Sequence, residues 1–173
     1  DLTAFPTANG AVADLTRYPV AESHEDFLML VETPGRSLGW SVVSRKAERD
    51  RIIVLKRPDV LPVTMLWMSN GGRDYAPWSG RHTGVLGIED GRASASGHAD
   101  SVRQNELNRS GIPTAFDLAR ERRIVIRQIV GACSAGQGEG RLGDVSVQAG
   151  SLILHFHDGA ARRLAFDPEF LSG

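Results

Sequence analysis

The chain of 173 residues contains one cysteine, Cys133, which excludes an internal disulfide. It also has no apolar run near the roughly 18 residues that a membrane-spanning helix needs, and we expect no signal peptide. The formal net charge is only −1, with both signs well mixed, which is not typical of partners of nucleic acid or of anionic membranes. These absences predict a soluble protein in a reducing cytoplasm.

Motifs with a defined chemistry are absent from the sequence as well. It has no glycine-rich phosphate loop, no nucleophile elbow and no paired-cysteine metal motif. We therefore expect no cofactor and no metal, so any catalytic or binding site would consist of side chains outside these motifs.

What the sequence does contain is a series of short apolar or alternating runs separated by turn residues. They predict strands over residues 26–33, 38–45, 51–56, 64–70, 84–89, 122–133, 145–148, 151–157 and 162–166. Their short connections favour antiparallel pairing, because parallel strands need crossovers of about a dozen residues or more. We expect an all-β antiparallel sandwich, with residues 1–173 as one domain and residues 1–21 as an irregular lead-in.

One short surface helix is expected outside the sheets, over His98 to Arg109. It is closed by Gly111, and Pro113 prevents its continuation. Asn105 and Asn108 are interpreted as surface or capping groups of this helix and not as ligands.

The stretch Leu61 to Glu89 is the most informative part of the chain. Alternation over residues 64–70 places Trp67 and Ser69 on one face of a strand and Leu66 on the other. The next strand has Gly87 and Glu89 on one face and ends at this glutamate. Glycine weakens a strand interior, so Gly87 indicates that another group approaches the backbone there.

The loop between these two strands combines planar rings with hydrogen-bonding groups. It carries Arg73, Trp78 and His82, close in sequence to Trp67. A sugar offers an apolar ring face and a rim of hydroxyls, which such a mixture suits. The alternative is that both tryptophans are ordinary core or lid aromatics and that the charged groups are solvated.

The run WMSNGGRDYAPWSGRHTGVLGIEDG resembles a segment of the aldose 1-epimerase (galactose mutarotase-like) family, and HADSVRQNELNRSGIPTAFDL resembles the part that follows it. The resemblance covers about Glu22 to Cys133. It implies that the chain corresponds to the C-terminal half of a galactose mutarotase-like sandwich. It also implies that Glu89 is the general base that removes the proton of the anomeric hydroxyl of a sugar.

The chain departs from the family pattern in two places. Asp90 stands where the family has a proline after the glutamate, and no segment carries the family's general-acid histidines. His82 is the nearest candidate acid and His24 the second. If Phe27 matches a phenylalanine of the family, His24 falls where the family has a sugar-binding aspartate; the alternative is a strand-edge histidine that faces water.

The resulting hypothesis is an aldose 1-epimerase-like protein that acts on a monosaccharide or a sugar derivative. Glu89 and His82 are its predicted catalytic residues, and the predicted substrate-binding residues are His24, Trp67, Arg73 and Trp78. The alternative hypothesis is a non-catalytic carbohydrate-binding module on the same fold. Open sheet edges also make a homodimer an expectation.

A third hypothesis is a metal-dependent enzyme built on His155 and His157. These histidines share one face of the strand over residues 151–157, whereas Leu152, Leu154 and Phe156 are expected to face the core. The spacing indicates no third ligand, and the simpler interpretation is a solvated face of a hairpin.

Overall fold

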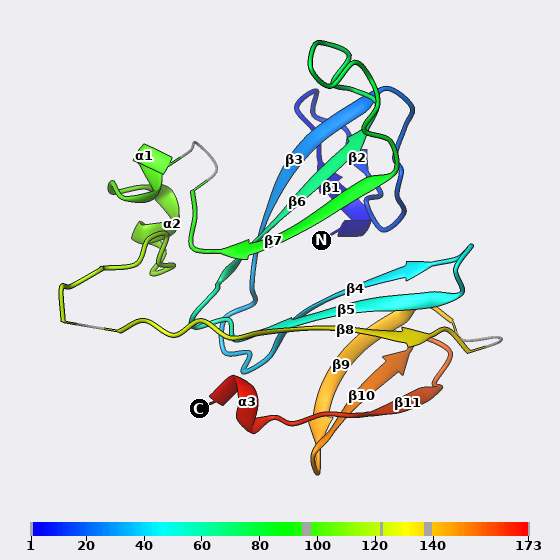
Figure 1. Cartoon of the computed structure of the whole chain (residues 1–173), viewed down its shortest axis with the longest axis vertical. Coiled ribbons are helices and arrows are strands. Elements are labelled where there is room, and N and C mark those ends of the chain that lie inside the picture. The colour runs from blue at the N-terminus through cyan, green and yellow to red at the C-terminus, as the bar shows by residue number, and fades with distance from the viewer. Residues whose placement is uncertain (1, 95–97, 122, 137–139, 173) are drawn as a thin grey trace. The chain divides into compact units, whose positions relative to one another are not determined.

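The computed structural model describes residues 2–94, 98–121, 123–136 and 140–172, and most of its elements are strands (Figure 1). The strands form four small antiparallel sheets, in the orders β1-β2, β3-β6-β7, β4-β5-β8 and β11-β10-β9. The expected all-β antiparallel class is thereby confirmed. In chain order the elements are η1 (Leu2–Ala4), β1 (Phe5–Pro6), β2 (Val12–Ala13), β3 (His24–Val31), β4 (Gly39–Arg45), β5 (Asp50–Lys56), β6 (Val63–Asn70), β7 (Val85–Gly91), α1 (His98–Ser101), α2 (Glu106–Arg109), β8 (Gln128–Ser134), β9 (Leu142–Gln148), β10 (Ser151–Phe156), β11 (Ala161–Ala165) and α3 (Glu169–Ser172).

The chain divides into two compact units, and each is formed by two separate segments. The first unit comprises Asp1–Val31 and Thr64–Asp90, and the second comprises Glu32–Val63 and Gly91–Gly173. Sheets β1-β2 and β3-β6-β7 belong to the first unit. Sheets β4-β5-β8 and β11-β10-β9 belong to the second.

Strand β8 is shorter than its apolar sequence predicts. It was expected over residues 122–133 but begins at Gln128, which pairs with Lys56. Lys56 is the last residue of β5, so the described residues 123–127 have no partner strand in this sheet. The start of β8 is therefore fixed by the length of its neighbour. Arg122, at which the predicted strand began, lies outside the described residues.

The lead-in and the predicted helix also differ from expectation. Residues 1–21 were predicted to be irregular, but they contain a short hairpin in which Phe5 pairs with Ala13. The helix expected over residues 98–109 is two four-residue helices, α1 and α2. The backbone of Asn105 is extended, which interrupts the helix between α1 and α2. Asn105 and Asn108 form a capping box at the start of α2, so their predicted capping role is confirmed.

The core of the first unit confirms the predicted phase of its strands. Leu28, Leu66 and Met68 are its buried residues, and Leu86 and Ile88 of β7 pack against them. Because side chains alternate along a strand, the other face of the same sheet carries Trp67, Ser69, Gly87 and Glu89. That second face holds the candidate site.

The two sheets of the second unit share one apolar core. Ile53 and Leu55 of β5 pack with Leu152, Leu154 and Phe156 of β10, which confirms the predicted inward face of β10. Ile153 was expected on the opposite face and is nevertheless buried as well.

The second unit also buries a charged side chain. Lys56 is 1% exposed, and its Nζ lies 3.1 Å from Glu32 Oε1 and donates a hydrogen bond to the Val63 carbonyl at 3.3 Å. An ion pair and a hydrogen bond thus offset the cost of burying this charge.

Candidate functional site

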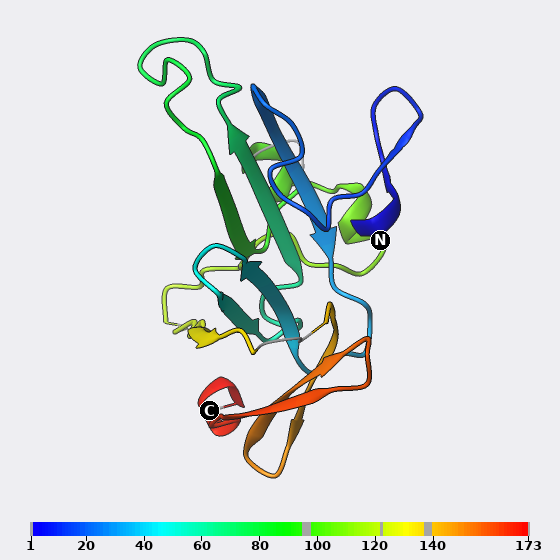
Figure 2. The ribbon, with the colours of Figure 1, turned by 90° about the vertical axis from the view of Figure 1, so that its right-hand side faces the viewer.

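The candidate site lies in the first unit, on the face of the β3-β6-β7 sheet opposite its core. The loop over residues 71–84 joins β6 to β7 and extends beyond the ends of these strands (Figures 1 and 2). Hydrogen bonds within the loop fix its path: the amide of Gly71 donates to the His82 carbonyl at 2.5 Å, and the amide of Gly80 donates to the Arg73 carbonyl at 2.7 Å. The loop is therefore an ordered part of the site.

The carboxylate of Glu25, on β3, is the polar centre of the site. Oε1 accepts hydrogen bonds from Trp67 Nε1 at 2.6 Å and from Arg73 Nε at 2.5 Å. Oε2 accepts from the Ser69 hydroxyl at 2.7 Å. Glu25 thereby joins β3, β6 and the loop, and its charge is paired with that of the Arg73 guanidinium.

These contacts change the acidity of Glu25. Burial raises the pKa of the carboxyl, but the hydrogen bonds from Ser69, Trp67 and Arg73 and the positive charge of Arg73 lower it by more, so the pKa lies below its ordinary value. Glu25 is ionised at neutral pH, and its two oxygens accept hydrogen bonds from donors of the protein itself. Glu25 therefore positions the side chains of Trp67, Ser69 and Arg73.

Four rings and one guanidinium form a continuous cluster on this face. The Trp67 ring is parallel to Phe27, with centroids 6.0 Å apart and an interplanar angle of 7°. The Arg73 guanidinium lies over both tryptophans, 4.8 Å from the Trp67 centroid and 5.1 Å from that of Trp78. Phe27 is 51% exposed, so this cluster presents an apolar ring surface to solvent.

His82 completes the cluster between the two tryptophans. Its ring centroid lies 5.4 Å from that of Trp67 and 4.9 Å from that of Trp78. Its Nδ1 is buried and has no hydrogen-bond partner among the described residues. An unpaired buried nitrogen costs stability, so His82 Nδ1 is open to a hydrogen bond from a water or a ligand.

Glu89 lies at the edge of this cluster with an unengaged carboxylate. A Cβ placed on Gly87 would lie 3.3 Å from Trp67 Cβ and 3.4 Å from Glu89 Oε1, so both side chains border the space that this glycine leaves free. The predicted close approach to Gly87 is thus made by Trp67. Glu89 is exposed and forms no hydrogen bond or ion pair with any residue that the structure describes.

Asp90, the residue after Glu89 in β7, makes a separate contact. The hydroxyl of Thr64 donates a hydrogen bond to Asp90 Oδ1 at 2.6 Å. Because side chains alternate along β7, this contact leaves the neighbouring Glu89 on the face of the aromatic cluster.

The structure brings Trp67, Arg73, Trp78 and His82 together but separates His24 from them. His24 stands at the start of β3, where its Nε2 lies 4.0 Å from Asp26 Oδ2. The next residue, Glu25, has its side chain in the site, so the alternation of β3 directs His24 toward the other face. Its predicted contact with substrate stays a prediction.

Sequence reasoning did not assign Glu25 and Phe27 to the site. Phe27 served only to align the chain with a family pattern, and Glu25 is distant in sequence from every group it binds. The alternation of side chains along β3 could have indicated both residues. Because Leu28 faces the core, Glu25 and Phe27 lie together on the opposite face.

Gly72 is required where the loop passes over β3. A Cβ there would lie 2.6 Å from both the Glu25 nitrogen and the His24 carbonyl carbon, and these backbone atoms cannot rotate away. We expect Gly72→Ala to lower the free energy of unfolding by about 2 kcal/mol or more, as overpacking does. Chemical denaturation measures this, with Gly91→Ala as control, because a Cβ at Gly91 meets nothing within 4 Å. Equal stability of the two variants would contradict the close packing.

The two histidines of the metal hypothesis do not lie in a metal-binding cluster. His155 Nε2 lies 2.7 Å from the Ser146 hydroxyl, and His157 is exposed. Within the described residues, no group of three or more histidine, cysteine or acidic side chains is placed to hold a metal ion. None of the helices in the same residues has both the length and the apolar sequence that crossing a bilayer requires.

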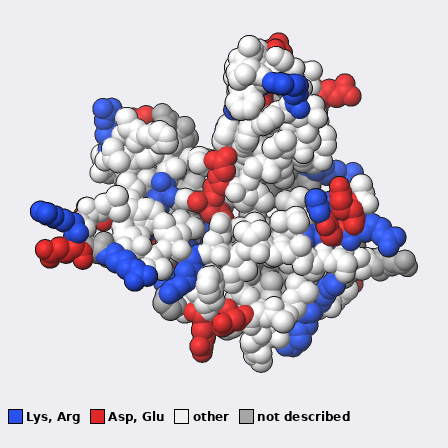
Figure 3. Space-filling view, in the orientation of Figure 1, with Lys and Arg blue, Asp and Glu red and all other residues white. Residues whose placement is uncertain are grey.

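Charge is distributed unevenly between the two units. The first unit carries eight acidic residues and three arginines, a formal net charge of −5, so the second unit has +4. On the face drawn in Figure 3, charged side chains form small groups with uncharged surface between the groups, and some groups contain both signs side by side. The site therefore belongs to the acidic unit.

Comparison of the chain with family profiles, with curated proteins and with solved structures finds no match.

Proposed function

We propose that the first unit binds a neutral monosaccharide and exchanges its anomers, as an aldose 1-epimerase does, with Glu89 as the general base. The observation that carries this proposal is the free carboxylate of Glu89 beside Gly87 and Trp67. The carboxylate of Glu25, in contrast, accepts hydrogen bonds from protein donors at both of its oxygens. A general base has to lie within hydrogen-bond reach of the proton that it abstracts, and an exposed carboxylate beside the rings can reach a sugar that rests on them.

The proposed reaction uses one base and one acid. Glu89 accepts the proton of the anomeric hydroxyl while protonated His82 donates a proton to the ring oxygen, so the bond between C1 and the ring oxygen breaks. The resulting C1 aldehyde rotates about the bond to C2. The hydroxyl formed from the ring oxygen then attacks the opposite face of the C1 aldehyde. It returns its proton to His82, while Glu89 returns its proton to the oxygen on C1. The reaction consumes no other reactant.

Phe27, Trp67 and Arg73 would hold the sugar in this reaction. The half-exposed Phe27 ring offers a stacking surface for the apolar face of the sugar. The η nitrogens of Arg73 make no hydrogen bond to the described residues, so they can donate to sugar hydroxyls. The net charge of the first unit, −5, disfavours sugars that carry a phosphate or a carboxylate.

We also propose that the chain adopts a galactose mutarotase-like sandwich and forms a homodimer. A galactose mutarotase-like sandwich accommodates antiparallel sheets with a shared core, as the second unit has. Each three-stranded sheet also has two edge strands, and pairing of such edges between two copies would give the expected homodimer.

NMR exchange spectroscopy between α and β anomers tests the activity directly. We expect the protein to accelerate exchange of at least one neutral aldose above the spontaneous rate, with weaker binding of glucuronate and glucose 6-phosphate. Binding of neutral sugars without any acceleration would instead support a carbohydrate-binding module. The tight packing of Arg73 between two tryptophans, which fixes a surface without supplying an acid, favours that second candidate.

Phe27→Ala is expected to weaken sugar binding about 2- to 13-fold, because a stacking ring contributes about 0.5–1.5 kcal/mol. Folding should be little affected, since Phe27 is half exposed and its ring contact is with Trp67. Titration followed by NMR or calorimetry measures the affinity. Phe170→Ala is the matched control, because Phe170 is 48% exposed and lies in the second unit. An unchanged affinity in Phe27→Ala would remove Phe27 from the site.

A further inference from the structure

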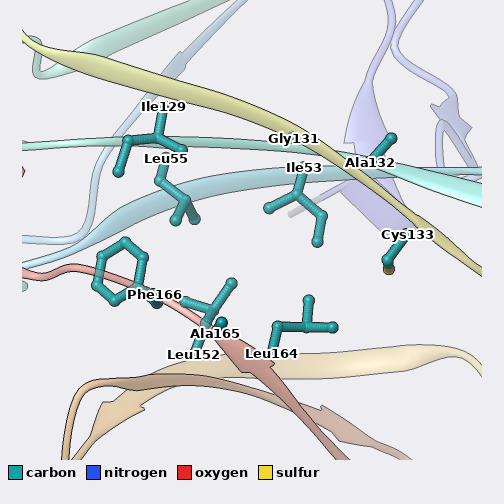
Figure 4. Close-up of a pocket in the computed structure, with 10 residues that line it drawn as sticks. All are labelled: Ile53, Leu55, Ile129, Gly131, Ala132, Cys133, Leu152, Leu164, Ala165 and Phe166. Carbon is teal, nitrogen blue, oxygen red and sulfur yellow. The ribbon is translucent and has the colours of Figure 1, made fainter.

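The second unit contains an apolar pocket that the proposed function does not use. The pocket has a volume of about 250 Å³ and is lined from both sheets. Figure 4 shows Ile53 and Leu55 pointing toward Leu152, Leu164 and Phe166 across it. The two sheets leave this space beside strands β8 and β11, each of which is an edge strand of its sheet.

The pocket is open on the side of β8 because the exposed residue Gly131 carries no side chain there. Ile129, Gly131 and Cys133 alternate along β8, and Ile129 and Cys133 both pack against the shared core. Gly131 pairs with Ile53, yet a Cβ built on it would meet no atom within 4 Å. The glycine leaves open the volume that a larger side chain would fill.

The lining determines what can enter this space. The only side-chain heteroatom in the lining is the sulfur of Cys133, and all the other side chains are hydrocarbon. An enclosed apolar cavity of about 150 Å³ is known to admit benzene. This pocket has the same kind of lining but is open to solvent beside Gly131, Ala132 and Ala165, which are exposed, so a ligand can enter it directly. A space of about 250 Å³ is large enough for one aromatic ring system.

We propose that this pocket is a binding site for an uncharged aromatic molecule with one or two fused rings, such as indole. The apolar walls would cover the faces of the ring, and the thiol of Cys133 would lie beside it. This inference is independent of the proposed sugar site, because every residue that lines the pocket belongs to the second unit.

The single cysteine of the chain makes the proposal directly testable. We expect millimolar indole to slow alkylation of Cys133 by iodoacetamide at least 5-fold. Nuclear Overhauser contacts should also appear between indole protons and the methyl groups of Leu152 and Leu164. An unchanged alkylation rate together with the absence of these contacts would overturn the proposal.

Two variants of neighbouring residues provide the comparison. Gly131→Val fills the pocket and should abolish both the protection and the contacts. Val130→Ala should keep both, because Val130 is 68% exposed and has the opposite phase on β8. Equal protection in Gly131→Val and in the unchanged chain would show that indole binds elsewhere. If Gly131→Val does not fold, the contacts to Leu152 and Leu164 in the unchanged chain decide the question.

Discussion

Glu89→Gln is expected to reduce the rate of anomer exchange by about 100- to 10,000-fold, the usual contribution of one general base. The amide has nearly the shape of the carboxylate but cannot accept the anomeric proton. Because Glu89 is exposed and has no hydrogen bond or ion pair among the described residues, its replacement should leave stability and sugar affinity nearly unchanged. NMR exchange rates at saturating sugar, compared with binding constants from titration, separate the two effects.

Glu22→Gln is the control for this variant. Glu22 is another exposed glutamate of the first unit, in the segment before β3, and its replacement should leave the exchange rate unchanged. Exchange at the original rate in Glu89→Gln would show that Glu89 is not the base. A loss of sugar binding in that variant would instead assign Glu89 to ligand recognition.

Glu25→Ala is expected to lower the free energy of unfolding by about 2–4 kcal/mol. The substitution leaves Trp67 Nε1, the Ser69 hydroxyl and the Arg73 guanidinium without their common acceptor. Released from Glu25, Arg73 would also lose its fixed position over the two tryptophans, so sugar affinity should fall as well. Urea denaturation measures the stability. Asp26→Asn, a change at the next and more exposed residue, should stay within about 0.5 kcal/mol of the original.

The contribution of Glu25 should also depend on pH in a defined direction. Its pKa is lower in the folded protein than the ordinary value of 4.5, so the folded state binds this proton less readily than the unfolded state does. The stabilisation is therefore complete above about pH 4.5 and is lost as the pH falls through the lower pKa of the folded state. The stability difference between the original protein and Glu25→Gln should shrink below pH 4.5. A difference that stays constant down to pH 2 would contradict this assignment.

The sequence was most informative where a local pattern determines the structure. Alternation in β6 and β7 correctly separated Leu66 and Ile88, in the core, from Trp67 and Glu89, on the opposite face. Turn residues and short connections correctly predicted antiparallel pairing. These features depend on neighbours along the chain, so one sequence is enough to predict them.

Features that depend on distant parts of the chain were not predictable in the same way. Glu25 binds groups that are 42 to 48 residues away in sequence, and no local pattern marks it as their acceptor. The start of β8 depends on where β5 ends, and the division into two units depends on which sheets share a core. The hairpin before residue 14 was missed because its strands are only two residues long.

The interleaving of the two units in the chain has a consequence during synthesis on the ribosome. The first unit has all its strands once Asp90 has emerged, whereas the segment Glu32–Val63 of the second unit is made in between and has to wait for β8 to β11. Until then, the apolar side chains of Ile53 and Leu55 have no partner sheet to cover them. A nascent chain that has emerged as far as Asp90 would therefore contain all the strands of the first unit together with a β4-β5 hairpin whose apolar face is still uncovered. Exposed apolar surface of this kind is what chaperones bind.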